Sequence, residues 1–224
     1  MRNAIVLSVI YLLGISSLLI FNEVVYRRLR PSGEITRKFA HFSAVLATLP
    51  FPYIFPSHWY ILVLAGLFAA VLFGTQKGKL LGSIHDINRK SIGSYLLPIA
   101  IYVTFLISDV LDNKFLFILP MLILAVCDPL AAIIGINVRN YNHNIRVFGI
   151  TLNKTWLGTA TFLISCCILS VIALYFNRGV FDLKSFWLAA LVAVTTTLAE
   201  LISWRGSDNL AIPLTAVLTL VLFL

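Results

Sequence analysis

The chain alternates between long apolar runs and short polar segments, and most of the apolar runs are long enough to be membrane helices. A transmembrane helix needs about 20 mainly apolar residues. The pattern predicts helices at residues 3–22, 39–56, 58–75, 93–108, 115–136, 157–176, 184–203 and 209–224. Pro50, Pro52 and Pro56 interrupt the second run, and the last run is short for a full crossing. We therefore expect an all-α, polytopic membrane protein with seven or eight transmembrane helices in one bundle.

Composition supports this prediction. Of the 224 residues, 60% are hydrophobic and 12% are charged, more apolar surface than a soluble domain of this length can bury. The apolar stretch at 4–21 is too long for a signal peptide and is followed by basic residues, so we expect a first membrane helix there. No linker or repeat divides the chain. We expect a single integral-membrane catalytic domain over 1–224, with an N-terminal helix and basic loop at 1–36 and a core at 37–224.

The distribution of charge predicts how the helices are oriented. The net charge is +8, and thirteen of the seventeen Lys and Arg residues fall in the loops on one side of the predicted bundle. Lys and Arg are concentrated in cytoplasmic loops. The N-terminus is therefore expected outside, and most polar clusters are expected on the cytoplasmic face. We attribute the positive charge to anionic lipid and an anionic substrate, and not to nucleic acid.

The stretch at 195–213 carries the strongest sign of chemistry. Glu200 lies inside an apolar run, which breaks at Arg205 and Gly206 and resumes after Asp208 and Asn209. Ionisable residues at membrane depth are rare and mark functional sites. The alternative is a tight turn in which Gly206 ends one helix and Asp208 caps the next, but a turn does not explain Glu200.

A second acid lies deep in the fifth predicted helix. Asp128 is followed by Pro129, which has no N–H and disfavours helix at the preceding residue. This predicts a broken helix lining protein or a wet cavity. In the alternative, Asp128 caps a second half-helix that begins at Pro129.

Basic groups suited to anions stand at several predicted helix starts. Arg37, Lys38 and His41 lie within about one helical turn, although an interfacial basic pair beside an incidental histidine is equally consistent with the pattern. Groups suited to phosphate occur at two further helix starts, as Arg89, Lys90, Ser91 and Gly93 and as Lys154, Thr155 and Gly158. Together with the carboxylates of Asp128, Glu200 and Asp208, which suit Mg²⁺, they indicate phosphoryl transfer from a nucleoside triphosphate.

Five ordered pieces of the chain resemble a known family. They are RKFAH (37–41), RKSIGSYLLP (89–98), DPLAAIIG (128–135), KTWLGT (154–159) and AELISWRGSDNLAIPL (199–214). Their order and spacing are similar to those of the dolichol kinases, phytol kinases and CTP-dependent diacylglycerol kinases, which are related to the phosphatidate cytidylyltransferases. The resemblance covers most of the chain from residue 37 onward. Two departures are Ile136, where a basic residue is expected, and Leu157, where an acid is expected.

The resemblance implies a membrane enzyme that uses CTP and Mg²⁺ to phosphorylate a lipid alcohol such as a polyprenol, dolichol, phytol or diacylglycerol. By position, the metal and catalytic acids are Asp128, Glu200 and Asp208. The implied nucleotide and phosphate ligands are Arg89, Lys90, Ser91, Gly93, Lys154, Thr155, Gly158, Arg205 and Asn209. Glu200 is the first candidate for the general base and His41 the second.

Two other functions use the same residue types. A cytidylyltransferase producing a CDP-lipid is less consistent with the chain, since the long acidic C-terminal signature of those enzymes is missing after Arg205. An ion-coupled transporter predicts an inverted repeat, and inspection finds none. The oligomeric state does not follow from the sequence.

Overall fold

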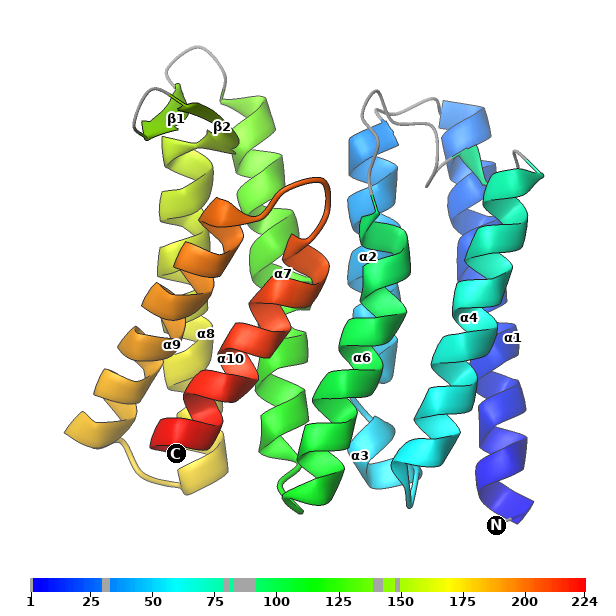
Figure 1. The fold of residues 1–224 in the computed structure, drawn as a ribbon, viewed down its shortest axis with the longest axis horizontal. Coiled ribbons are helices and arrows are strands. Elements are labelled where there is room, and N and C mark those ends of the chain that lie inside the picture. Colours follow the sequence, from blue (N-terminus) through cyan, green and yellow to red (C-terminus); the bar gives the residue numbers. More distant parts are fainter. Residues whose placement is uncertain (1, 30–32, 79–80, 83–91, 139–142, 148–149) are drawn as a thin grey trace.

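The computed structural model describes residues 2–29, 33–78, 81–82, 92–138, 143–147 and 150–224. Its long helices lie side by side in a bundle, and consecutive long helices run in opposite directions (Figure 1). The helices are α1 (Arg2–Leu29), α2 (Gly33–Thr48), α3 (Phe51–Ile54), α4 (His58–Lys77), α6 (Gly93–Val110), α7 (Phe115–Asn137), α8 (Trp156–Arg178), α9 (Leu183–Ile202) and α10 (Asp208–Phe223). The two chain ends lie at the same end of the bundle.

The predicted helices are present, and the second differs most from its prediction. The helix expected at 39–56 is instead α2, which begins at Gly33 and ends at Thr48, followed by the four-residue α3. Pro50 occupies the N-cap position of α3, and Pro52 lies in its first turn. Because proline has no N–H and restricts the residue before it, the chain restarts as a short second helix.

The predicted break at Asp128 is wrong. The helix α7 runs without interruption from Phe115 to Asn137, with Pro120 and Pro129 inside it. Pro129 removes one backbone donor, whereas a full break would leave several groups unpaired in an apolar surrounding. Losing one hydrogen bond costs less, so Asp128 is an interior helical residue and not a cap.

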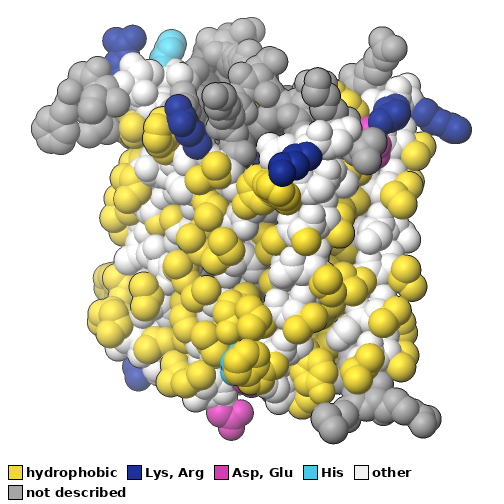
Figure 2. Space-filling view, turned by 45° about the vertical axis from the view of Figure 1, so that its right-hand side comes forward, with side chains coloured by type: hydrophobic (Ala, Val, Ile, Leu, Met, Phe, Trp, Pro, Cys, Tyr) yellow, Lys and Arg dark blue, Asp and Glu magenta, His cyan; other side chains and the backbone are white. Residues whose placement is uncertain are grey.

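The lengths of the helices fit a membrane. Among the described residues, six helices are long and apolar enough to cross one, namely α1, α4, α6, α7, α8 and α9. The 16-residue α2 and α10 run alongside them (Figure 1). Figure 2 shows apolar side chains over the middle of one face and most of its visible Lys and Arg near the upper end. The all-α, polytopic membrane fold is confirmed, and the outward N-terminus stays a prediction.

The helix α7 forms the centre of the bundle. Buried residues make up 61% of its span, and it contacts α2, α6, α8 and α10. Phe117, Met121 and Leu124 are fully enclosed. At the edge of the bundle (Figure 1), only 11% of the α1 span and 17% of the α4 span are buried. Polar residues on α7 are therefore held rigidly, whereas α1 and α4 present apolar surface outward.

A β-hairpin that the sequence did not predict connects α7 to α8. Strands β1 (Asn144–Val147) and β2 (Ile150–Thr155) are antiparallel, and Asn144 pairs with Thr155. The second strand leads directly into α8 (Figure 1). It thereby carries Lys154 to the end of the bundle at which α2, α6, α8 and α10 begin.

Candidate active site

A buried ion pair joins α2 to α7. The Lys38 Nζ lies 2.5 Å from the Asp128 Oδ2, and the two side chains are 6% and 4% exposed. A charged pair away from water is retained only when each charge compensates the other. The interfacial interpretation of Lys38 is therefore wrong, and Lys38 belongs to the cluster of acids predicted from the sequence.

His41 lies beside this pair, one turn further along α2. Its Nε2 is 3.9 Å from the Asp128 Oδ2, which is too far for a hydrogen bond. The same nitrogen is buried and has no hydrogen-bond partner among the described residues. Arg37 is buried as well, and it lines a small cavity together with His41. The Nε2 of the imidazole is thus buried beside the ion pair and makes no hydrogen bond within the described part of the chain.

A second charged cluster brings together three elements. Lys154, from β2, donates a hydrogen bond to the Glu200 Oε1 near the end of α9. Its Nζ also lies 3.5 Å from the Asp208 Oδ2 at the start of α10. Glu200 and Asp208 are both buried. The hairpin therefore supplies a cation to two acids that the sequence separates from it by about 50 residues.

The environment of Lys154 keeps it charged. Burial lowers the pKa of its ammonium, but the nearby carboxylates of Asp208, Glu200 and Asp128 raise it, and the net pKa lies above its usual value. The shift also shows that Asp128 lies near enough to act on Lys154. The two ion-paired clusters are therefore one electrostatic unit.

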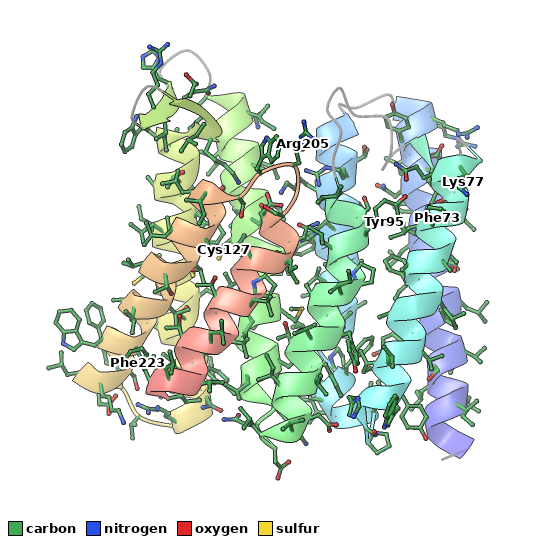
Figure 3. The ribbon with its side chains drawn as sticks, viewed as in Figure 1. Phe73, Lys77, Tyr95, Cys127, Arg205 and Phe223 are labelled. Carbon is green, nitrogen blue, oxygen red and sulfur yellow. The ribbon has the colours of Figure 1, made fainter. Side chains whose placement is uncertain are left out.

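The loop between α9 and α10 holds Arg205 at the mouth of the cluster. Arg205 and Gly206 have positive φ angles of 51° and 91°. The Ser207 Oγ accepts a hydrogen bond of 2.9 Å from the Trp204 N–H, and the guanidinium of Arg205 lies 4.0 Å from the centre of the Trp204 ring. Figure 3 shows Arg205 at the same end of the bundle as Lys77. The exposed Arg205 is therefore accessible to a soluble anion.

This loop corrects the turn interpretation of the sequence. The helix α9 ends at Ile202, before Gly206, and Asp208 is the first residue of α10 and not its cap. One carboxylate oxygen of Asp208 accepts a hydrogen bond of 3.0 Å from the Asn209 N–H. The other faces Lys154. Asp208 is thus held in the cluster from both sides.

Asn209 connects the cluster to α6. Its Nδ2 donates a hydrogen bond of 2.8 Å to the Gly93 carbonyl, and the Ile92 N–H donates one of 2.9 Å to the Arg205 carbonyl. A Cβ at position 93 would lie 2.9 Å from the Asn209 Nδ2 and 3.1 Å from the Gly206 oxygen. Glycine is therefore required at 93 for the close approach of two backbones.

Thr155 and Gly158 organise the start of α8. The Thr155 hydroxyl accepts a hydrogen bond of 3.2 Å from the Gly158 N–H and so caps the helix. A Cβ at Gly158 would lie 3.1 Å from the Ala131 carbonyl, and one at Gly135 would lie 2.9 Å from the Thr155 hydroxyl. These contacts let α7 and α8 approach closely, and they fix the position from which Lys154 reaches the acids.

The structure brings together most of the site residues predicted from the sequence. His41, Asp128, Lys154, Glu200, Asp208 and Asn209 lie at one end of the bundle, with Arg205 at its mouth. Arg89, Lys90 and Ser91 lie outside the described residues. Lys38 was predicted only as one of three basic groups suited to an anion, and its pairing with Asp128 was not predicted. Its position three residues before His41, on the same predicted helix, was the signal available in the sequence.

The polar atoms of Glu200 and Asn209 that lack partners among the described residues are oxygens, which suit a hard cation or a hydrogen-bond donor. Among the described side chains, the Glu200 Oε2 and the Asn209 Oδ1 are buried without a hydrogen-bond partner. The described part of the chain contains no group of three or more His, Cys, Asp or Glu placed to hold a metal by itself. Mg²⁺ usually binds one or two carboxylates together with substrate phosphates. The residues present therefore fit a Mg²⁺ ion that arrives with a nucleotide.

A larger cavity lies at the opposite end of the bundle. It measures about 580 Å³ and is lined mainly by the Asp112–Phe115 region and by α8. None of the predicted site residues that the structure describes borders it. Because it lacks the acids and cations described above, its size alone does not make it a site for phosphoryl transfer.

Comparison with known proteins identifies the family. No family model matches the chain, and no solved structure matches it. A phytol kinase from Synechocystis sp. is 30% identical over 195 residues, which cover 86% of this chain and 80% of that protein. The matched region necessarily includes most of the helices that build the charged cluster. The chain therefore belongs to the family of phytol and dolichol kinases.

Proposed function

We propose that this protein is a Mg²⁺-dependent kinase that transfers the γ-phosphoryl group of CTP to the hydroxyl of a membrane lipid alcohol. The observation that carries the proposal is the buried cluster of Asp128, Glu200 and Asp208 with Lys38 and Lys154, located at one end of a membrane bundle. Such a cluster is costly to keep in an apolar surrounding and marks a functional site. Membership of the family gives that site its chemistry.

The cations at the mouth of the cluster bind the triphosphate in this proposal. Arg205 is exposed and offers a planar guanidinium, which suits two phosphate oxygens at once. Lys154 lies deeper and remains charged, so its ammonium is available to the phosphate nearest the acids. Charge that accumulates on the transferred group is thereby stabilised by fixed cations.

The acids would hold the metal that accompanies the nucleotide. Glu200 offers a buried carboxylate oxygen without a partner among the described residues, and Asp208 is buried at the start of α10. A bound Mg²⁺ would neutralise charge on the phosphate oxygens. Asp128, paired with Lys38 on the rigid α7, fixes the other side of the cluster.

Two groups are suited to accept the proton of the attacking hydroxyl. The Glu200 Oε2 and the His41 Nε2 are both buried and have no hydrogen-bond partner among the described residues. A general base must reach the proton directly or through one water. The position of the alcohol therefore decides between them.

The similarity to a phytol kinase favours an isoprenoid alcohol as the acceptor. Phytol and dolichol carry one primary hydroxyl at the end of a single apolar chain. An alcohol of this kind reaches the cluster from the bilayer, while a soluble nucleotide approaches from the water at the same end of the bundle. The predicted basic loops at that end are consistent with an anionic nucleotide.

The test is transfer of label from γ-labelled CTP to lipid. Purified protein is incubated in detergent with Mg²⁺ and, in turn, phytol, geranylgeraniol, dolichol and diacylglycerol, and label is counted in the lipid phase. We expect transfer to at least one isoprenoid alcohol. Asp208→Asn should abolish it. Asp112→Asn should leave transfer intact, because Asp112 is exposed at the opposite end of the bundle and asparagine readily adopts the positive φ angle found there.

Two results would contradict the proposal. Release of pyrophosphate when phosphatidate is added, with no transfer to any alcohol, would indicate a cytidylyltransferase. Equal loss of transfer in Asp112→Asn and Asp208→Asn would show that the cluster has no special role. Competition by unlabelled ATP, GTP and UTP in the same assay measures the preference for CTP.

A further inference from the structure

A small cavity lies next to the charged cluster, between α1, α2, α4, α6 and α10. Its apolar lining comes from Leu19, Ala40, Ala44, Phe68, Leu72 and Leu97. Its polar lining comes from Arg37, His41, Ser94 and Asn209. The cavity therefore has an apolar wall, to which the edge helices α1 and α4 contribute three of the six residues, and a polar part that includes two residues of the proposed site.

Two polar atoms that face this cavity have no hydrogen-bond partner among the described residues. The His41 Nε2 and the Asn209 Oδ1 are buried, and neither has a hydrogen-bond partner among the described residues. Their residues are 6% and 2% exposed. A buried acceptor left unpaired costs free energy, so such atoms in native proteins call for a bound ligand or water. The Asn209 Oδ1 accepts hydrogen bonds, and so does the His41 Nε2 in the neutral tautomer with its proton on Nδ1, as a hydroxyl donor requires.

The size of the cavity limits what enters it. The cavity is partly open and measures about 40 Å³. About 10–15 Å³ of such space is enough for one water, so the cavity has room for a terminal hydroxymethyl group but not for a lipid chain. The chain of any lipid that places its hydroxyl here must leave the cavity between the edge helices.

The edge helices provide a path for that chain. Most of the α1 and α4 spans face outward, and Leu67 and Val71 of α4 are exposed apolar residues close in sequence to the lining residues. A small apolar cluster of Leu19, Leu72 and Leu81 is separate from the main core. The wall between the cavity and the bilayer is therefore thin and apolar.

We infer that this cavity receives the hydroxyl end of a single-chain lipid alcohol, with the hydroxyl hydrogen-bonded to His41 or Asn209 and the chain lying along α1 and α4. This inference rests on the proposed kinase function and makes His41, rather than Glu200, the group that accepts the hydroxyl proton. As the oxygen bonds to the γ-phosphorus and the bond to the nucleoside diphosphate breaks, the proton passes to the imidazole. A cavity of about 40 Å³ admits one hydroxymethyl end but not the two ester groups beside the hydroxyl of a diacylglycerol, so the site selects against diacylglycerol.

Filling the cavity tests the inference. Ala44→Leu adds three carbon atoms to a lining residue, and Ala47→Leu makes the same change one turn away on α2, at a residue that does not line the cavity. We expect Ala44→Leu to lower kcat/KM for phytol at least tenfold while the KM for CTP stays within twofold. Ala47→Leu should leave both parameters within twofold. Unchanged kcat/KM for phytol in a folded Ala44→Leu protein would overturn the inference.

Cross-linking uses the unmodified protein, so its result depends neither on whether a variant folds nor on catalytic turnover. A farnesol analogue with a diazirine close to its hydroxyl is irradiated with the protein, and labelled peptides are mapped. Label on α1, α2 or α4 that unlabelled phytol competes away supports the inference. Label confined to the large cavity around α8 overturns it, even if the probe is phosphorylated.

The two readouts separate this inference from the proposed function. Competed label in the small cavity without phosphorylation of any alcohol would support the binding site and contradict the kinase. Phosphorylation with label elsewhere would do the reverse. Diacylglycerol phosphorylated as efficiently as phytol would contradict the selectivity derived from the size of the cavity.

Discussion

Removing the charge of Lys38 should lower the free energy of unfolding of the protein more than almost any other single change at the site. In Lys38→Met the Asp128 carboxylate stays buried without its counter-ion, since both side chains are almost fully enclosed and their polar atoms are 2.5 Å apart. Breaking a buried pair in this way costs about 3–5 kcal/mol. For a chain of this size the melting temperature falls about 2–4 °C per kcal/mol, which gives a decrease of roughly 6–20 °C.

The assay is thermal unfolding in detergent followed by the fluorescence of the four tryptophans. Asp128→Asn should also destabilise, because it leaves Lys38 without its carboxylate. The double variant, Lys38→Met with Asp128→Asn, removes both charges and should melt at a higher temperature than either single variant. The two variants that carry Asp128→Asn should lack kinase activity, since Asp128 is one of the proposed site acids.

Additivity would refute this reasoning. If the double variant is destabilised by the sum of the two single effects, the two residues do not compensate each other and the ion pair is not the source of the stability. Full activity in the stabilised double variant would instead remove Asp128 from the catalytic machinery. Ala47→Leu, which alters α2 without touching the pair, serves as the folding control.

Three further predictions concern packing, capping and orientation. Gly93→Ala should destabilise the protein by about 1–3 kcal/mol, because the new Cβ has no room. Gly66→Ala is the control, since nothing lies within 4 Å of its new Cβ, and it should not destabilise the protein. Equal melting temperatures of the two variants would contradict this prediction. Thr155→Ala should cost about 1 kcal/mol by removing the cap of α8, and Thr155→Ser should restore most of it in the same melting assay. In intact cells a membrane-impermeant maleimide should label Asp112→Cys but not Trp204→Cys, and the opposite labelling would invert the predicted orientation.

The helices were predictable because the apolar runs are long and their ends are marked by polar residues. Asp182 illustrates such a mark: it caps α9 by accepting a hydrogen bond of 2.8 Å from the Ser185 N–H, and hydrogen bonds from Ser185 hold its pKa below the usual value. The acids Glu200 and Asp208 were equally predictable, because a charge within an apolar run stands out without any knowledge of tertiary structure.

The partners of those acids were not predictable from local patterns. Lys38 and Asp128 are 90 residues apart, and their contact depends on the packing of α2 against α7. Lys154 reaches Glu200 only because a β-hairpin turns the chain back at the end of α7, and its strands are too short for a clear alternation of apolar and polar residues. The break expected at Pro129 failed for a similar reason. A local rule about proline was overruled by the cost of opening a helix inside the bundle.

The pairing of acids with lysines affects how the purified protein should be handled without nucleotide or divalent ion. Asp128, Glu200 and Asp208 contribute three negative charges, and Lys38 and Lys154 return two positive ones, so the described cluster carries a net charge of about −1 without any dissolved ion. These ammonium groups are covalently tethered counter-ions, which neither dilution nor a chelator can remove. Extraction and storage in EDTA should therefore abolish activity reversibly while the lysines still balance two of the three acid charges, and activity should recover when nucleotide and divalent ion are added back together.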